Sequence, residues 1–255
     1  MGIIVERRIT ARVQILVAVT LAAAVYIGAM AGGAQAQPAS ANDTARLLAG
    51  MQPAPGSSLL ALTKERAWQQ HANRLNAIFA QVENRQLTRI RSWSRTKLTT
   101  PSPVLFYMFS GPDFLYANAF FPNATTYVMS GLEPTGPVPD LTKLSRDSLA
   151  YGQRGVEESL SSILTYSFFQ TIDMRRTLVA GPMPGTLPIL YVFLARSGKV
   201  IQDVSLVRVD EEGSVHIDDG VAGDAKSIRG VKVDFVDDEA RQKTLYYFKI
   251  GRAHV

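Results

Sequence analysis

The region that most constrains the fold is residues 104–133, where two strand-like runs are separated by turn residues. Residues 104–109 form an unbroken apolar run of strand length, which is typical of a strand buried on both faces. The sequence Ser-Gly-Pro-Asp at 110–113 turns the chain and suits the start of a helix, which we predict over 114–121. Residues 125–129 are β-branched and aromatic and predict a second strand. We therefore expect a βαβ unit with parallel strands in the middle of a mixed sheet.

Both predicted strands are followed by a Ser-Gly pair and then, within two residues, by a carboxylate. Ser110 and Asp113 follow the first strand, and Ser130 and Glu133 follow the second. Because open α/β sheets bind ligands at the carboxyl ends of their strands, we interpret these four residues as ligand-binding candidates. They also have a structural interpretation, since an Asp favours the start of a helix and the Gly and Pro around Glu133 turn the chain.

The sequence has no motif that assigns a catalytic residue. It lacks G-x-S-x-G, H-E-x-x-H and any cysteine, and its glycines match neither the dinucleotide-binding nor the P-loop pattern, so we expect no cofactor. The acidic turns near the C-terminus lack the spacing of a calcium loop, so we expect no metal site. We interpret His71 as a helix-packing residue and His216 as a surface residue. One enzymatic alternative remains, a metal-independent hydrolase that uses Asp113 and Glu133 as paired carboxylates.

Residues 1–36 have the pattern of a secretory signal peptide. Three arginines precede an apolar stretch over 13–30, and Ala-Gln-Ala at 34–36 is a cleavage site. We expect an exported protein, periplasmic or extracellular, and an uncleaved N-terminal membrane anchor is the alternative. The lack of cysteine excludes a disulfide and a lipoprotein anchor.

Residues 250–255 resemble the translation of a DNA-sequencing adapter, so we expect the natural chain to continue differently beyond residue 249. The formal net charge of +5 then falls to +2, because residues 1–36 carry +2 and Arg252 carries +1. A net charge this small argues against nucleic acid as a partner.

The segment that follows the signal peptide, residues 37–62, is rich in Ala and Pro and predicts a linker or surface arm. Over residues 63–94, apolar side chains recur every three or four positions, which predicts a helix that packs on the sheet through Trp68 and Trp93. Residues 64–97 include eight basic and two acidic side chains. We interpret this charge as a solvated outer face, with contact to an anionic membrane surface as the alternative.

The second half of the chain changes from helical to strand periodicity. Residues 156–178 predict a second long helix, and the Pro-rich segment 134–140 predicts a stiff loop over the edge where the candidate residues lie. Antiparallel strands are expected at 187–195, 200–209, 214–217, 230–236 and 244–249. The expected fold class is α/β, a single domain over 63–249 whose mixed sheet has a central parallel βαβ unit, flanking long helices and a C-terminal antiparallel meander.

Three segments carry a resemblance to known sequences: SGPDFLYANAFFP at 110–122, TTYVMSGLEP at 125–134 and TLYYFK at 244–249. Together they resemble a family of uncharacterised exported bacterial proteins, over about half of the mature chain. The resemblance implies export and a longer natural chain, and it implies no activity. We therefore expect an exported globular domain that binds a small molecule at the strand-end crevice. The sequence predicts neither the ligand nor the oligomeric state.

Overall fold

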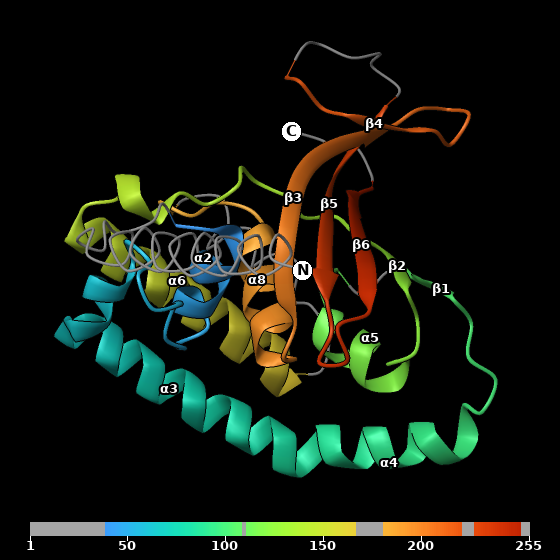
Figure 1. Ribbon diagram of the computed structural model, residues 1–255, viewed down its shortest axis with the longest axis horizontal. Coiled ribbons are helices and arrows are strands. Elements are labelled where there is room, and N and C mark those ends of the chain that lie inside the picture. The colour runs from blue at the N-terminus through green and yellow to red at the C-terminus, as the bar shows by residue number, and fades with distance from the viewer. Residues whose placement is uncertain (1–38, 109–110, 167–180, 221–226, 251–255) are drawn as a thin grey trace, which may run out of the picture. The chain divides into compact units, whose positions relative to one another are not determined.

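The computed structural model describes residues 39–108, 111–166, 181–220 and 227–250, and these contain a six-stranded mixed sheet (Figure 1). The strands are β1 (Val104–Tyr107), β2 (Thr126–Gly131), β3 (Val200–Val209), β4 (Val215–Ile217), β5 (Ile228–Val236) and β6 (Gln242–Lys249). Their order across the sheet is β1-β2-β6-β5-β3-β4. The pairs β1-β2 and β2-β6 are parallel, and the remaining neighbours are antiparallel. The predicted α/β class with a mixed sheet is confirmed.

Helices pack around this sheet. The α-helices are α2 (Ala41–Leu48), α3 (Arg66–Val82), α4 (Thr88–Lys97), α5 (Phe114–Phe120), α6 (Arg146–Tyr166) and α8 (Leu187–Arg196). A π-helical turn at Glu83–Leu87 joins α3 to α4, and short 3-10 helices lie at Leu60–Lys64 and Leu141–Lys143. Figure 1 shows α2, α6 and α8 grouped to one side of β3, with α3 and α4 running below the sheet.

The βαβ unit forms as predicted, with β1 and β2 parallel and α5 between them, but it does not lie in the middle of the sheet. β1 is an edge strand, because β6 occupies the other side of β2. Its residues alternate between exposed and half-buried, whereas the sequence predicted burial on both faces. An apolar run does not reveal whether its strand is central or at an edge, because only the tertiary pairing decides this.

Helix α8 occupies the centre of the core, where the sequence predicted a strand. This prediction is wrong: residues 187–195 are helical, and every one of their side chains is buried. A helix surrounded by other elements is apolar on all sides, so it loses the periodicity that would distinguish it from a buried strand. Pro188 suits the first turn of a helix, and Gly198, with φ of 73°, follows its C-terminal end instead of forming a hairpin turn.

Helix α2 belongs to the core, so residues 39–62 are not the linker or surface arm that their composition predicts. Ser40 and Asp43 form a capping box at its start, with the Ser40 hydroxyl 3.0 Å from the Asp43 backbone nitrogen. Leu47 and Leu48 are fully buried, and α2 packs on α8. The helix has only eight residues, so its capping box and its apolar side are weak signals within an Ala- and Pro-rich segment.

The other predicted helices are present with shifted bounds. The helix over residues 63–94 is confirmed as α3 and α4, but only one of its two tryptophans packs in the core. Trp68 is buried and donates its indole N–H to Leu47 O at 3.0 Å, whereas Trp93 is 48% exposed and meets the edge of Phe120. The helix predicted over 156–178 begins earlier, at the start of α6, and its second half lies outside the described residues.

Candidate functional site

The carboxyl ends of β1 and β2 lie side by side at one edge of the sheet. Val104 pairs with Thr126 and Tyr107 with Met129, so the two strands end at nearly the same level. The Gly111 backbone N–H donates to Ser130 O at 3.1 Å, which joins the loops that follow the strands. The two Ser-Gly loops therefore meet at one edge, as the parallel arrangement predicts.

The backbone at Gly131 is closely packed by neighbouring residues. A Cβ at this position would lie 2.6 Å from Tyr247 Oη, 2.8 Å from Glu133 Oε2 and 2.9 Å from Gly111 Cα. These distances are shorter than van der Waals contact, so only glycine fits without movement of its neighbours. The absence of a side chain at 131 lets the Glu133 carboxylate and the Tyr247 hydroxyl approach the same backbone segment.

Of the four predicted binding residues, neither serine is shown to present its hydroxyl to a ligand. Ser130 is fully buried and its hydroxyl donates to Met108 Sδ at 3.7 Å, so it faces the protein interior. Ser110 lies outside the described residues. The two carboxylates, Asp113 and Glu133, remain as the chemically informative candidates.

Asp113 is the N-cap of α5, and it remains partly exposed. Its carboxylate accepts a hydrogen bond from the Tyr116 backbone N–H at 3.3 Å, which is the structural role that the sequence allowed for. Burial raises the pKa of Asp113 to about 8, although the hydrogen bond from Tyr116 favours the ionised form. At neutral pH this carboxyl group therefore carries its proton and can donate a hydrogen bond.

Two phenols adjoin Asp113, Tyr107 from the end of β1 and Tyr116 from α5. Burial, and then the charge of Asp113, raise the pKa of each to about 12, so both keep their protons. The Tyr116 hydroxyl donates to Gln86 Oε1 in the π-helical turn. Asp113 thus lies near two phenols from separate elements, and one of them, Tyr116, is hydrogen-bonded to a third element.

Glu133 lies deeper than Asp113, with 3% of its surface exposed. The Tyr247 hydroxyl donates to the Glu133 backbone carbonyl at 3.0 Å. Burial, and then the charge of Glu133, raise the pKa of Tyr247 above its ordinary range. Glu133 is therefore tied to β6 as well as to the loop that carries it.

The Pro-rich segment 134–140 is anchored to the start of α8. The backbone N–H groups of Thr186 and Leu187 donate to Pro134 O at 3.0 Å and to Thr135 O at 3.1 Å. Gly136 lies against the backbone of Pro184, where a Cβ would clash at 2.0 Å. The beginning of this loop is therefore held in place, which also fixes the chain just after Glu133.

The sequence did not reveal Tyr107, Tyr116 and Tyr247, which lie near the two carboxyl groups, or Gln86, which accepts from the Tyr116 hydroxyl. Only Tyr116 has a local signal, because it lies three residues after the helix N-cap. The others come from separate elements and meet the site only after the sheet and helices pack.

The arrangement places two carboxyl groups with different surroundings at one sheet edge. A carboxyl group held in its protonated form can donate to a ligand or act as a general acid. Glu133 is the second carboxyl group at this edge, and only 3% of its surface is exposed. Within the described ranges, no group of three or more His, Cys, Asp or Glu side chains could hold a metal ion. The chemistry that these residues support by themselves is hydrogen bonding and proton transfer.

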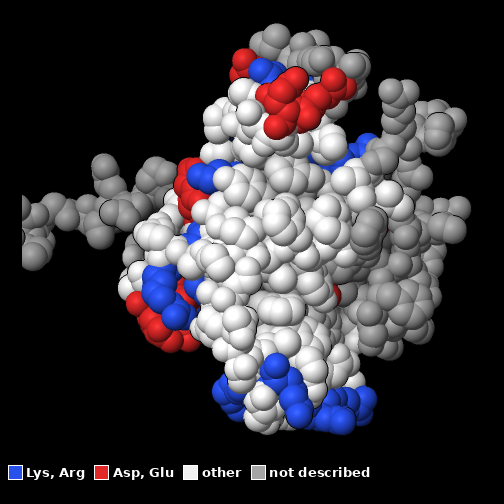
Figure 2. Space-filling view, turned by 90° about the vertical axis from the view of Figure 1, so that its right-hand side faces the viewer, with Lys and Arg blue, Asp and Glu red and all other residues white. Residues whose placement is uncertain are grey.

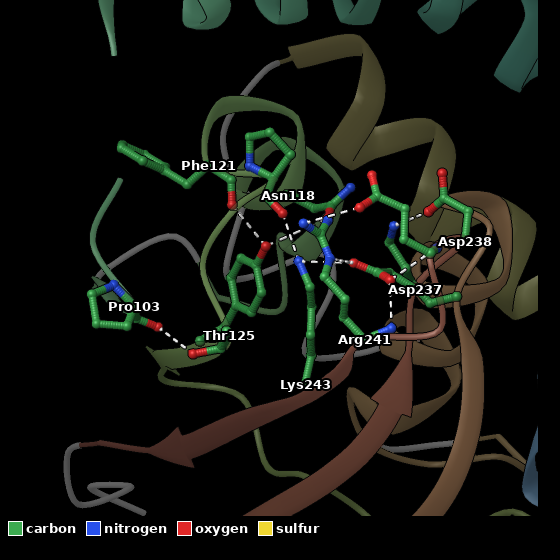
Figure 3. A network of polar contacts seen from close by, with 12 residues as sticks. Pro103, Asn118, Phe121, Thr125, Asp237, Asp238, Arg241 and Lys243 are labelled. Carbon is green, nitrogen blue, oxygen red and sulfur yellow. Dashed lines mark hydrogen bonds and ion pairs between the residues drawn. The ribbon is translucent and has the colours of Figure 1, made fainter. Parts of the chain in front are cut away.

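A second polar cluster lies at the start of β6 and is structural (Figure 3). Asp237 has a side chain 1% exposed and accepts from the backbone N–H groups of Glu239 and Arg241 at 3.0 and 2.9 Å, and from Arg241 Nε at 2.8 Å. The buried Lys243 ammonium lies 3.4 Å from Asp237 and donates to Pro122 O at 2.6 Å. Burial alone would raise the pKa of Asp237, but these hydrogen bonds outweigh it and hold the pKa below its usual range. Asp237 therefore holds the turn between β5 and β6 together and is not a solvated surface carboxylate.

The two histidines take the roles that the sequence predicts. His71 is 1% exposed, with Nε2 2.8 Å from Leu48 O and Nδ1 2.7 Å from Glu157 Oε1, so it joins α3 to α2 and α6. His216 is exposed and lies 2.7 Å from Asp210 Oδ2 on the same hairpin. Neither adjoins the strand-end carboxylates in sequence or through a shared hydrogen bond among the described residues.

Comparison of the chain with protein-family models, curated proteins and solved structures found no match. Nor does any helix in the described part of the chain combine the length and apolar character needed to cross a membrane.

Proposed function

We propose that this protein is an exported binding domain that holds a small molecule at the carboxyl edge of β1 and β2, through Asp113 and Glu133. The observation that supports this most is the setting of Asp113, a partly exposed carboxyl group with a pKa of about 8 beside two protonated phenols. Strongly shifted carboxyl groups at strand ends are more frequent at functional sites than elsewhere. The Tyr116 O–H already donates to Gln86, so the O–H groups left for a ligand are those of Asp113 and Tyr107. They favour a polar ligand that offers hydrogen-bond acceptors.

A thermal-shift screen with a panel of small polar metabolites tests this proposal. A ligand present at about 100 times its Kd should raise Tm by about 5 °C or more in a chain of this size. Asp113→Asn keeps a capping residue at α5 but removes the ionisable group, and it should abolish the shift. Asp140→Asn is the matched control, because Asp140 also begins a short helix and accepts from Thr142 N at 3.1 Å. If no compound stabilises the protein, or if Asp113→Asn responds like the wild type, the proposal fails.

A second proposal assigns hydrolysis to the same two carboxyl groups. The raised pKa of Asp113 favours it, because a general acid must hold a proton at the working pH. Paired-carboxylate glycosidases place their two groups about 5–10 Å apart. Turnover of glycoside substrates that disappears in both Asp113→Asn and Glu133→Gln would support this reaction, and turnover retained in either variant would exclude it.

A third proposal concerns the membrane surface and rests on α4. Trp93 is 48% exposed on a helix that also carries Arg89, Arg91, Arg95 and Lys97, a combination found in helices that lie on anionic lipid. Burial of Trp68 restricts this role to α4 and removes α3 from it. Sedimentation with anionic and neutral vesicles tests it, and equal binding to both would count against it.

A further inference from the structure

β1 presents an apolar row of side chains at the edge of the sheet. Val104, Phe106 and Met108 are 40%, 69% and 42% exposed, and as alternate residues of one run they share a face. Phe106 lies next to Val128 in the register of β2, so the row continues an existing apolar surface. Among the described strands, β1 has only β2 as a neighbour. Exposed apolar groups that gather in this way mark an interaction surface.

The side of the protein that carries β1 and β2 also has few charged side chains. Residues 98–125 contain Asp113 as their only charged side chain. Figure 2 shows this side as a largely uncharged surface between two charged ends. Its middle is therefore suited to apolar contact rather than to a charged partner.

The two ends of this side have opposite charge (Figure 2). The acidic end is the β3-β4 hairpin, with Asp210, Glu211, Glu212, Asp218 and Asp219. The basic end is α4, with Arg89, Arg91, Arg95 and Lys97. On the hairpin, Asp210 already pairs with His216, Asp218 with Arg229 and Asp219 with Arg208. On α4, Arg91 pairs with Glu83, whereas Arg89, Arg95 and Lys97 are exposed and form no ion pair with any described residue.

We propose that this side binds a second copy of the chain in a two-fold symmetric dimer. The two-fold axis lies in the plane of the contact, at right angles to the line that joins the charged ends. This axis places the acidic hairpin of each copy opposite α4 of the other copy, so the charged contact forms twice. It also places the apolar rows around Phe106 against each other. A two-fold interface must be self-complementary, and a face with opposite charges at its two ends meets that condition.

The charge pattern favours a second copy over other occupants. An anionic membrane would attract α4 but repel the acidic hairpin on the same side. A uniformly acidic or basic protein would likewise match one end only. A second copy provides both charges at the required spacing, because it carries the same surface.

The mass of the full chain in solution gives the first test, measured by light scattering and sedimentation from sub-micromolar to sub-millimolar concentration. We expect a concentration-dependent dimer, and a stable interface of ordinary size would bury about 800 Å² on each partner. Phe106→Glu should leave a folded monomer, as judged by circular dichroism and Tm. Tyr151→Glu is the control, because Tyr151 is 54% exposed on α6, away from this side, and it should leave the dimer intact.

Charge reversal gives a sharper test. Arg89→Glu, Arg95→Glu and Lys97→Glu together leave Arg91 as the one basic group of α4 and make that end acidic. Glu211→Lys, Glu212→Lys and Asp219→Lys together leave two of the five acidic groups and make the hairpin basic. Each triple variant alone should dimerise at least about tenfold more weakly, because like charges then face each other. An equimolar mixture of the two should recover the dimer, since the reversed ends are complementary across the pair.

Three results would overturn the proposal. They are a monomer at every concentration, a dimer that Phe106→Glu leaves unchanged, and a mixture of the charge variants that stays monomeric. Binding of anionic vesicles by the wild-type monomer, without any dimer, would assign the surface to lipid instead. The test is independent of the proposed ligand site, because neither Asp113 nor Glu133 is altered.

Discussion

Replacing Asp237 by alanine is expected to destabilise the fold more than replacing its partner Lys243 by methionine. Asp237→Ala removes an acceptor for two backbone N–H groups and for Arg241, and it leaves the buried Lys243 ammonium without a counter-ion. Breaking a buried ion pair in this way costs about 3–5 kcal/mol. In Lys243→Met the three other donors still satisfy Asp237, and only Pro122 O loses its partner, at a cost of about 1–3 kcal/mol.

Urea unfolding followed by tryptophan fluorescence measures this difference, because Trp68 is buried in the core. The double variant should be less destabilised than the sum of the two single variants, since removing Lys243 also removes the unpaired charge. Glu239→Ala is the control: its side chain is 69% exposed and its partner Arg241 is 46% exposed, so loss of this ion pair should cost less than about 1 kcal/mol. Equal costs for Asp237→Ala and Lys243→Met, or strict additivity, would refute the reasoning.

Three further predictions concern the core and the strand edge. His71→Ala should lower the free energy of unfolding by about 2–4 kcal/mol, because it loses two buried hydrogen bonds and leaves a cavity, whereas the exposed His216→Ala should cost less than about 1 kcal/mol in the same urea experiment. Because the folded-state pKa of Asp113 is raised from 3.8 to about 8, the folded state binds this proton more tightly, so stability should fall as pH rises between these values; Asp113→Asn should remove this dependence in thermal unfolding across that range. Gly131→Ala should cost more than about 2 kcal/mol, because its Cβ meets backbone as well as side chains, whereas Gly152→Ala meets the flexible end of Met183 and should cost less; equal Tm losses would contradict this.

The sequence predicted those elements whose local signals agree with their tertiary setting. The strands β1 and β2 are bounded by Ser-Gly pairs, and the amphipathic stripe of α3 points its apolar side to the core, so all three were found. Helix α8 has no polar side, because it is surrounded by other elements, and so its pattern could not be distinguished from that of a buried strand. Residue propensity and hydrophobic periodicity depend on residues close in the sequence. They do not show whether a segment is buried on one side or on all sides.

For the candidate site, too, the sequence predicted the positions of some residues and not the packing around them. The sequence placed Asp113 and Glu133 at one edge, because parallel strands end together, and the structure places their loops in contact. It could not predict that Tyr107 and Tyr116 would lie near Asp113, or that Gln86 would accept from Tyr116, since these residues come from three elements that pack only in the folded chain. Nor could it predict the pKa of Asp113, because burial depends on that packing.

The most direct test of the account is a pH titration of the Asp113 carboxyl carbon by ¹³C NMR, with the signal assigned by its loss in Asp113→Asn. The account predicts a midpoint near 8, with the group protonated at neutral pH and able to donate to a ligand. A midpoint near the ordinary value of 3.8 would mean that Asp113 is a solvated helix cap, and it would contradict the proposed binding site.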